Sequence, residues 1–338
     1  MYGAESGTCN RQAAGYSKGG KDQSRRRSDL RRNWGWSPRR KMELRVLRYF
    51  LGVAVSGSMT GAARVLHVTQ PTLSRQLQEL EEELGQKLFV RGSHSVTLTS
   101  EGMLLRKRAE EILDMVRKTE TEFGSLGETA AGEVHIGGGE TEAMRQIARI
   151  IGELQQEHPR LRFHLYSGNA EDVTERLDKG LLDFGLLIQP VDITRYHSLR
   201  LPDQDVWGVL MRKSCPLAGK TAVTRRDLEG LPLICSRQVV RRISQENAYA
   251  DWFGAERSNL KVTATYNLIY NAALLVEEGG GYAITLDKLV DMTGHRDLCF
   301  RPLEPKVESG VYFVWKKHQL FSKAAELFLD RLRRHLAA

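Results

Sequence analysis

Residues 70–78 include six polar side chains that can hydrogen-bond to the edges of DNA bases. Gln and Arg read base edges in the major groove, which a recognition helix enters with its N-terminal residues. No acid interrupts the run, because the acids begin only at Glu79 and continue at 81–83. The pattern favours a DNA-reading helix, and the alternative is an ordinary solvated helix face. The polar residues of the run are Gln70, Thr72, Ser74, Arg75, Gln76 and Gln78.

Two helices joined by a tight turn would position this run. The first helix carries small residues at 61–63, which let a second helix approach closely, and residues 67–68 make the turn. Thr69 is a favourable N-cap and Pro71 is tolerated in a first helical turn, so the second helix begins near Gln70. Its apolar stripe, which we expect to pack on a core, comprises Leu73, Leu77, Leu80 and Leu84.

From Met42 to about Leu113 the chain resembles the LysR-type transcriptional regulators, through the residues MELRVLRYFLGVAVSGSMTGAARVLHVTQPTLSRQLQELEEELGQKLFVRGSHSVTLTSEG. The resemblance implies a winged helix-turn-helix domain over 42–98, a dimerising linker helix over 99–127 and an effector-binding domain over 132–338. It also implies DNA contacts from the recognition helix and the wing. The matching residues are Gln70, Pro71, Thr72, Ser74, Arg75, Arg91 and His94.

Two departures from the family pattern concern the affinity for DNA. Position 61 is Gly where the family more often carries a basic or larger polar residue, and the wing GSHSV lacks Arg and Lys. Fewer cations near phosphates release fewer counterions, so we expect a shallow salt dependence of binding. Affinity would then depend more on oligomerisation.

Length and charge limit the classes of protein. A chain of 338 residues predicts two or three domains, and its 41% hydrophobic residues include no run long enough to span a membrane. No signal peptide is visible, so we expect a soluble protein in the cytoplasm. The net charge of +8 lies wholly in residues 1–41, where 11 Lys and Arg face 3 Asp and Glu, since the remainder holds 39 of each. The case for DNA binding therefore depends on the absence of acid from 44–78.

Residues 1–41 are rich in Gly, Ser and Arg, and we expect them to be disordered. The family pattern begins near Met42, so we hypothesise that this segment is an upstream extension and that Met42 is the natural first residue. The alternative is a basic arm that grips DNA phosphates through 25–27, Arg31 and Arg32.

The cysteines are Cys9, Cys215, Cys235 and Cys299. The sequence has no C-x-x-C and no histidine cluster at ligand spacing, so we expect no metal site and no cofactor. Free, mostly buried thiols are the simpler interpretation. The alternative is a redox switch between Cys215 and Cys235, because a few members of the family sense oxidants in this way.

Residues 100–124 predict one long helix with more apolar positions than a monomer would leave exposed. Its apolar side should face a partner helix, as in the family's dimer, and 128–132 is a plausible hinge after it. Two-fold symmetry then predicts an operator with two inverted half-sites. We expect a homodimer or a dimer of dimers, with double-stranded DNA and RNA polymerase as partners and no membrane contact.

From Glu133 onward strands alternate with helices, which predicts an α/β domain. Its pattern resembles the two-lobed, periplasmic-binding-protein-like effector domain of the family. Lobe I would cover about 132–202 and 304–338, and lobe II about 203–303. The fold class is therefore multidomain: a helical winged helix-turn-helix, a linker helix and a two-lobed α/β domain whose cleft takes a small-molecule effector.

Loops at the strand ends line this cleft in the family. The matching positions are Gly139, Thr141, Ser167, Asn169, Gln189, Pro190, Ser236, Arg237, Tyr266 and Asn267. Thr141 and Asn169 could instead simply cap their helices. A helix N-terminus in the cleft favours an anion, and Arg237, Arg241 and Arg242 could add to that attraction. Glu140 and Glu142 at that same helix start oppose it, which leaves the charge of the effector open.

Enzymatic interpretations find little support. The sequence has no G-x-S-x-G, no GK[ST] and no His–Glu pair at metal spacing, while His135, His158, His164 and Asp183 are scattered without a nucleophile beside them. We therefore expect no enzymatic activity. The alternatives are a small-ligand-binding or metabolic α/β protein with a DNA-binding appendage, and a non-specific architectural DNA protein.

Overall fold

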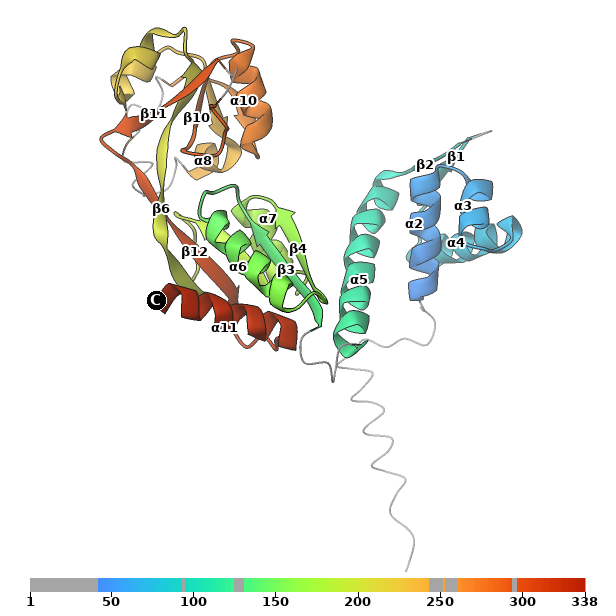
Figure 1. Ribbon diagram of the computed structural model, residues 1–338. Helices are drawn as coiled ribbons and strands as arrows, with labels where there is room; N and C mark the ends of the chain where they lie inside the picture. Colours follow the sequence, from blue (N-terminus) through green and yellow to red (C-terminus); the bar gives the residue numbers. More distant parts are fainter. Residues whose placement is uncertain are drawn as a thin grey trace, which may run out of the picture. The chain divides into compact units, whose positions relative to one another are not determined.

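The computed structural model describes residues 42–92, 95–124, 131–242, 252, 260–293 and 297–337. The expectations for 1–41, for His94 and for most of the hinge at 128–132 lie outside this range. The chain divides into two compact units, Met1–Leu113 and Asp114–Ala338, and Figure 1 shows their elements. Among the described residues, no helix has both the length and the apolar composition needed to cross a membrane.

The first unit is a helical domain with a short β-hairpin. Its core gathers Phe50 of the first helix, Leu73 and Leu77 of the recognition helix and Phe89 of the hairpin, with the rings of Phe50 and Phe89 5.2 Å apart. The elements are α2 (Leu44–Ser56), α3 (Met59–Val65), α4 (Gln70–Leu84), β1 (Phe89–Arg91), β2 (Val96–Leu98) and the first half of α5 (Ser100–Gly124).

Local signals set the ends of these helices. Ser58 caps α3 by accepting a hydrogen bond from the Gly61 backbone, and Gly57 and Gly85 end α2 and α4 with φ angles of 63° and 66°. Only glycine adopts this left-handed conformation without strain, so both positions stop their helices. One expectation was wrong: Leu84 is 38% exposed, because it lies in the last turn of α4, and the core stripe ends at Leu80.

The second unit is built on a mixed sheet with strand order β4-β3-β5-β12-β6-β10-β8-β9. Lobe I contains β3 (Gly132–Gly138), β4 (Leu161–Ser167), β5 (Phe184–Ile188), α6 (Met144–Glu157), α7 (Ala170–Asp178) and α11 (Lys323–Ala337). Lobe II contains β7 (Val223–Thr224), β8 (Leu233–Ser236), β9 (Val262–Tyr266), β10 (Tyr282–Leu286), β11 (Leu298–Glu304), α8 (Arg237–Arg242), α10 (Ile269–Glu277) and the 3₁₀ turns Pro216–Gly219 and Arg225–Leu228.

Two long antiparallel strands, β6 (Tyr196–Arg212) and β12 (Glu308–Lys316), join the lobes. β6 is 17 residues long: its first part pairs with β12 in lobe I, and its last part pairs with β10 and β11 in lobe II. The ladder between β6 and β12 shifts register between Gly310 and Tyr312.

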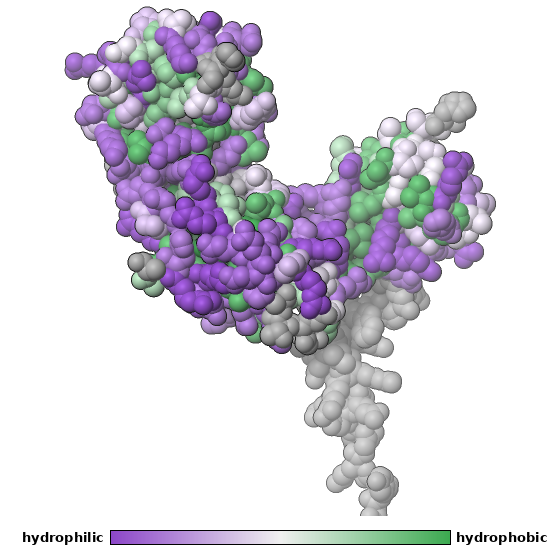
Figure 2. Space-filling model, viewed as in Figure 1, coloured by the Kyte–Doolittle hydropathy of each residue, from purple (hydrophilic) through white to green (hydrophobic). Residues whose placement is uncertain are grey.

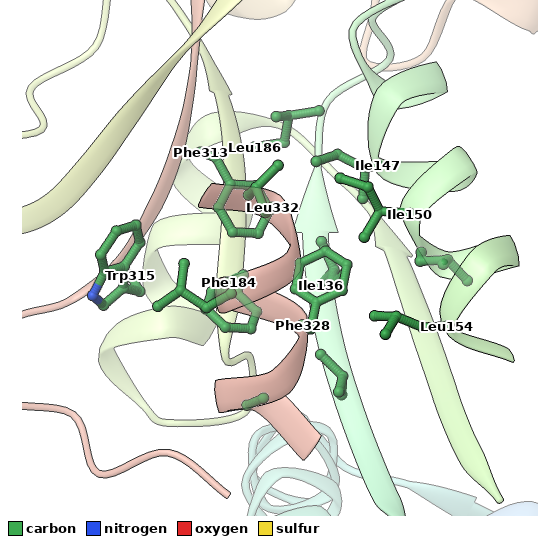
Figure 3. Packing of buried hydrophobic residues seen from close by; sticks show 14 of the residues in the cluster. Ile136, Ile147, Ile150, Leu154, Phe184, Leu186, Phe313, Trp315, Phe328 and Leu332 are labelled. Carbon is green, nitrogen blue, oxygen red and sulfur yellow. The ribbon is translucent and has the colours of Figure 1, made fainter. Parts of the chain in front are cut away.

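Each lobe packs apolar residues on both faces of its part of the sheet. In lobe I, α6 and α11 cover one face, where Phe184, Phe313 and Phe328 are fully buried (Figure 3). The rings of Phe184 and Phe328 lie 5.5 Å apart, a favourable separation for aromatic pairs. On the opposite face, α7 contributes Val173 and Leu177 to a smaller cluster.

Candidate functional site

The predicted recognition residues lie together at the start of α4. Thr69 precedes the helix, and its hydroxyl accepts a hydrogen bond from the backbone of Thr72 at 3.4 Å. The turn before it passes through His67 with a φ of 54°, and the fully buried Leu73 anchors the first helical turn on the core. The structure leaves Gln70, Pro71, Thr72 and Arg75 exposed and Ser74 half-buried.

Arg75 is held by its own helix. Its Nε donates to Glu79 Oε1 at 2.9 Å, and this hydrogen bond raises the pKa of Arg75. Gln76 Nε2 donates to the other oxygen of Glu79 at 2.7 Å. The Arg75 side chain is 79% exposed, and exposed pairs of this kind contribute little to stability, so a phosphate or base can replace Glu79 as its partner.

Glu81 has a structural role that the sequence did not indicate. It is buried, and its Oε1 accepts hydrogen bonds from the backbone of Leu88 at 2.8 Å and of Phe89 at 3.3 Å, while Lys87 pairs with Oε2. Burial raises the pKa of Glu81, but these hydrogen bonds outweigh it and leave the pKa below its ordinary value. The carboxylate thus ties α4 to the wing, where Arg91 pairs with Val96.

A cleft of about 830 Å³, counted to its open mouth, lies between the two lobes. Parallel strands end on both sides of it, and their carboxyl ends are the usual position of ligand sites in α/β folds. Seven residues that were predicted to bind the effector line this cleft: Gly139, Asn169, Gln189, Pro190, Ser236, Tyr266 and Asn267. Polar or aromatic lining residues that were not predicted from the sequence include Glu140, Trp207, Gln238 and Thr285.

Glu140 crosses the cleft. Its Oε2 accepts a hydrogen bond from the backbone N–H of Ile269, the first residue of α10, at 2.6 Å. Leu268, at the N-cap position of that helix, offers no capping side chain, so the carboxylate from lobe I serves as the cap. Burial raises the pKa of Glu140, although this hydrogen bond acts in the opposite direction.

Other side chains in the cleft differ in whether their hydrogen-bond donors have partners. Trp207 Nε1 donates to Ser309 at 2.8 Å and Tyr266 donates to the Ile284 carbonyl at 2.7 Å. The amide Nε2 of Gln238 is buried and has no hydrogen-bond partner among the described residues. A buried donor without a partner is costly, and an acceptor on a ligand would satisfy this one.

Three predicted effector residues do not line the cleft. The Thr141 hydroxyl donates to the buried carboxylate of Asp205 at 2.7 Å and accepts from the Ala143 backbone just before α6. Ser167 and Arg237 are exposed at the ends of their elements. Asn169 does line the cleft, but its side chain also caps α7 in a reciprocal pair with Asp172.

The proposed pairing of Cys215 with Cys235 meets a chemical obstacle. Cys235 is buried, and this burial raises the pKa of its thiol to about 12. The thiolate is the reactive form, so oxidation of this thiol is disfavoured. Cys215 instead lies close enough to Tyr282 and Cys299 to raise the pKa of each, after the larger effect of burial.

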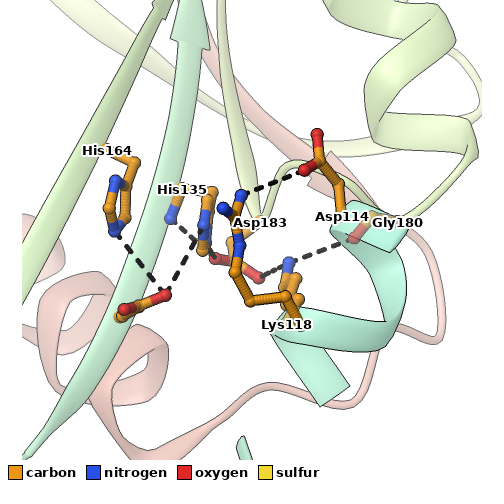
Figure 4. A network of polar contacts seen from close by, with 8 residues as sticks. Asp114, Lys118, His135, His164, Gly180 and Asp183 are labelled. Atoms are coloured by element: carbon orange, nitrogen blue, oxygen red, sulfur yellow. Dashed lines mark hydrogen bonds and ion pairs between the residues drawn. The ribbon is translucent and has the colours of Figure 1, made fainter. Parts of the chain in front are cut away.

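Histidines that looked scattered in the sequence do meet in the structure. His135 of β3 and His164 of β4 are register partners, and their rings stack with centroids 4.6 Å apart. Glu133 lies beside both rings, and Asp183 accepts a hydrogen bond from the His135 backbone at 2.8 Å and another from Lys118 at 2.7 Å (Figure 4). This cluster was not visible in the sequence, because linear spacing does not report contacts between neighbouring strands.

A helix-turn-helix and a two-lobed α/β domain with a cleft define the class of ligand-responsive DNA-binding regulators. The chain belongs to the LysR family of bacterial helix-turn-helix regulators. Residues 44–103 match the family description "bacterial regulatory helix-turn-helix protein, lysR family", and residues 127–337 match "LysR substrate binding domain".

Known proteins similar to this chain agree with that assignment. The chain is 32% identical over 302 residues to the HTH-type transcriptional regulator IlvY of Escherichia coli. The aligned region covers 87% of this chain and 100% of IlvY. It is 28% identical over 291 residues to the uncharacterized HTH-type transcriptional regulator YvbU of Bacillus subtilis, covering 86% and 97%. The crystal structure of the LysR family regulator CbnR shares the fold with a TM-score of 0.66 at 20% sequence identity, and the match covers 87% of this chain and 99% of CbnR. The structure of full-length CbnR with its target DNA has a TM-score of 0.64 at 21% sequence identity, with the same coverage.

Proposed function

We propose that this protein is a sequence-specific transcriptional regulator whose action on DNA is controlled by a small molecule bound in the cleft between lobes I and II. The observation that carries the proposal is the acid-free start of α4, where the side chains of Gln70, Thr72 and Arg75 are exposed to solvent. Bound DNA in the CbnR complex supports this mode of action.

The cleft supports an effector of defined chemistry. Gln238 offers a hydrogen-bond donor that no described residue uses, and the Glu140 carboxylate already occupies the N-terminus of α10. A neutral or cationic molecule with a hydrogen-bond acceptor fits these groups better than a free carboxylate, which would meet the charge of Glu140. Ligand binding that favours one arrangement of the lobes would shift the population of regulator states.

Self-association completes the proposal. Apolar side chains on α5 are exposed, including Leu104 at 61%, Ile112 at 38% and Phe123 at 69%. Figure 2 shows apolar surface along this helix. Burial of these side chains against a second copy would give a homodimer, or a dimer of dimers, suited to paired half-sites and able to contact RNA polymerase at a promoter.

Footprinting tests the function directly. The full chain is incubated with a DNA fragment that carries the promoter of the gene that encodes it. Protection of this fragment from cleavage is compared with protection of a random-sequence fragment of equal length. We expect a protected site with dyad symmetry. Equal protection of both fragments would instead identify a non-specific DNA-binding protein.

Tryptophan fluorescence tests the cleft. Because Trp207 lines it, a binding metabolite should change the emission of the wild type but not that of the Trp207→Phe variant. A metabolite that binds and leaves the footprint unchanged at saturation would refute control by that ligand.

A further inference from the structure

Glu133, His135 and His164 lie together on one face of the lobe I sheet. Alternate residues of a strand point to opposite faces. Val134 and Ile136 belong to the core under α6 and α11, so Glu133 and His135 project from the other face. His164 joins them because β3 and β4 are parallel and pair His135 with His164.

The three side chains offer one ligand atom each, and these atoms all lie within 4.8 Å of one another. Nε2 of His164 is 3.6 Å from Glu133 Oε2, and Nε2 of His135 is 4.0 Å from the same oxygen. Both separations are too long for hydrogen bonds. Ligand atoms about 2.0–2.2 Å from a tetrahedral zinc ion lie roughly 3.3–3.6 Å from one another, so small side-chain movements would suffice to enclose an ion.

The groups behind His135 resemble those that orient metal-bound histidines. A histidine that binds metal through Nε2 commonly donates its Nδ1–H to a carboxylate. Nδ1 of His135 is buried without a hydrogen bond in the described part of the chain, and it lies 3.6 Å from Asp183 Oδ2. Asp183 is held in turn by Lys118, which also donates to the Gly180 carbonyl (Figure 4). A small movement that closes the 3.6 Å gap would let Nδ1–H donate to Asp183 and leave Nε2 for an ion.

The surroundings leave room for an ion and its remaining ligands. A hollow of about 680 Å³, again counted to its mouth, adjoins the cluster and is lined by Arg117, Lys118 and Arg176 among others. These cations are engaged elsewhere: Arg117 pairs with Asp114 at 3.0 Å, Lys118 pairs with Asp183, and Arg176 lies over the Tyr166 ring. His164 is half-exposed, so the site opens to solvent.

We propose that Glu133, His135 and His164 bind one divalent transition-metal ion, with zinc as the ion that best suits two imidazoles and one carboxylate. Water completes the coordination from the hollow. None of these residues lines the effector cleft, so this is a separate site, and its existence does not depend on the proposed regulator function.

Metal titration of the full chain tests the proposal. The protein is stripped with a chelator and titrated with Zn²⁺ by equilibrium dialysis and with Co²⁺ by visible absorption. We expect one Zn²⁺ per chain and the intense d–d bands of a four- or five-coordinate Co²⁺ ion. Binding of less than one equivalent, or Co²⁺ bands no stronger than those of the hydrated ion, would overturn the proposal.

Variants identify the ligands. His164→Gln should weaken Zn²⁺ binding at least about 100-fold, more than the ~10–100-fold typical of second-shell substitutions. His158→Gln is the matched control, since His158 is a partly exposed histidine of the same lobe outside the cluster. His164→Cys should retain the ion and add a sulfur-to-cobalt charge-transfer band. Unaltered affinity in His164→Gln, or no such band in His164→Cys, would show that the ion binds elsewhere.

Discussion

Glu140 Oε2 lies 2.6 Å from the backbone nitrogen of Ile269, so a carboxylate of lobe I caps a helix of lobe II across the ligand cleft. A helix N-terminus in a cleft ordinarily attracts an anion from solution. Here the protein supplies that anion itself. An effector must therefore either accommodate Glu140 or displace it.

The Glu140→Gln variant tests this relationship. Removal of the charge keeps an oxygen that can cap α10, and it should increase the affinity of the cleft for small carboxylates by about tenfold. The measurement is a tryptophan fluorescence titration with small carboxylic acids and their primary amides. Glu142→Gln is the control, because Glu142 pairs with Arg145 and does not line the cleft. Tighter binding of carboxylates to the wild type than to Glu140→Gln would contradict the prediction.

Asp205 should make stability depend on pH. Burial raises the pKa of its carboxyl from 3.8 to about 6, despite the hydrogen bond from Thr141. Between these values the folded state retains a proton that the unfolded state has released, so stability falls as pH rises through this window. The loss is at most about 3 kcal/mol.

Urea denaturation at pH 4.5 and pH 7 measures that loss. Asp205→Asn should flatten the difference between the two values. Asp203→Asn removes an exposed neighbouring charge that contributes only a small part of the raised pKa of Asp205, so it should preserve most of the difference. The same pH dependence in Asp205→Asn and in the wild type would assign the effect to other groups.

Arg75→Ala should weaken binding to the operator by about 5- to 150-fold if Arg75 reads a base. Arg106→Ala is a matched control: Arg106 donates through Nε to Glu110 at 3.0 Å, in the same i,i+4 geometry as Arg75 and Glu79, but it lies on α5. Mobility-shift titrations at fixed salt compare the variants. Equal affinities for Arg75→Ala and Arg106→Ala would remove Arg75 from the DNA interface.

Glu81→Ala should lower the free energy of unfolding by about 1–3 kcal/mol, because it leaves the buried N–H groups of Leu88 and Phe89 without an acceptor. Since the folded pKa of Glu81 lies below its ordinary value, its contribution is present near neutral pH and is lost as pH falls through the acid range. Urea denaturation compares Glu81→Ala with Glu82→Ala, whose side chain is exposed. A smaller effect in Glu81→Ala than in Glu82→Ala would refute the role of this carboxylate.

The helix-turn-helix was predictable because its signals are local. Thr69 caps α4 and Gly85 ends it, and each acts within a few residues of its own position. The order of strands and helices in the second unit was predictable for the same reason. Several cleft-lining loops could be placed because the family resemblance aligns the ends of the strands.

Contacts between distant segments were beyond such reasoning. The sequence places Glu140 at the start of a helix, but its partner Ile269 is 129 positions away. His135 and His164 meet only because β3 and β4 pair in one particular register, and a shift by one residue would turn one ring to the opposite face. From the sequence, Glu81 would be assigned to a solvent-exposed helix face. Its burial follows from the position of the neighbouring strand β1.

The long strands β6 and β12 allow the two lobes to twist relative to one another but resist sliding. The lobes share continuous, hydrogen-bonded backbone, so relative sliding would break the ladder, whereas twisting of the ribbon would not. The register shift near Gly310 is the natural place for that twist. A bound molecule that stiffens the ribbon would carry information even when the average angle between the lobes stays the same, because it reduces the amplitude of their fluctuations.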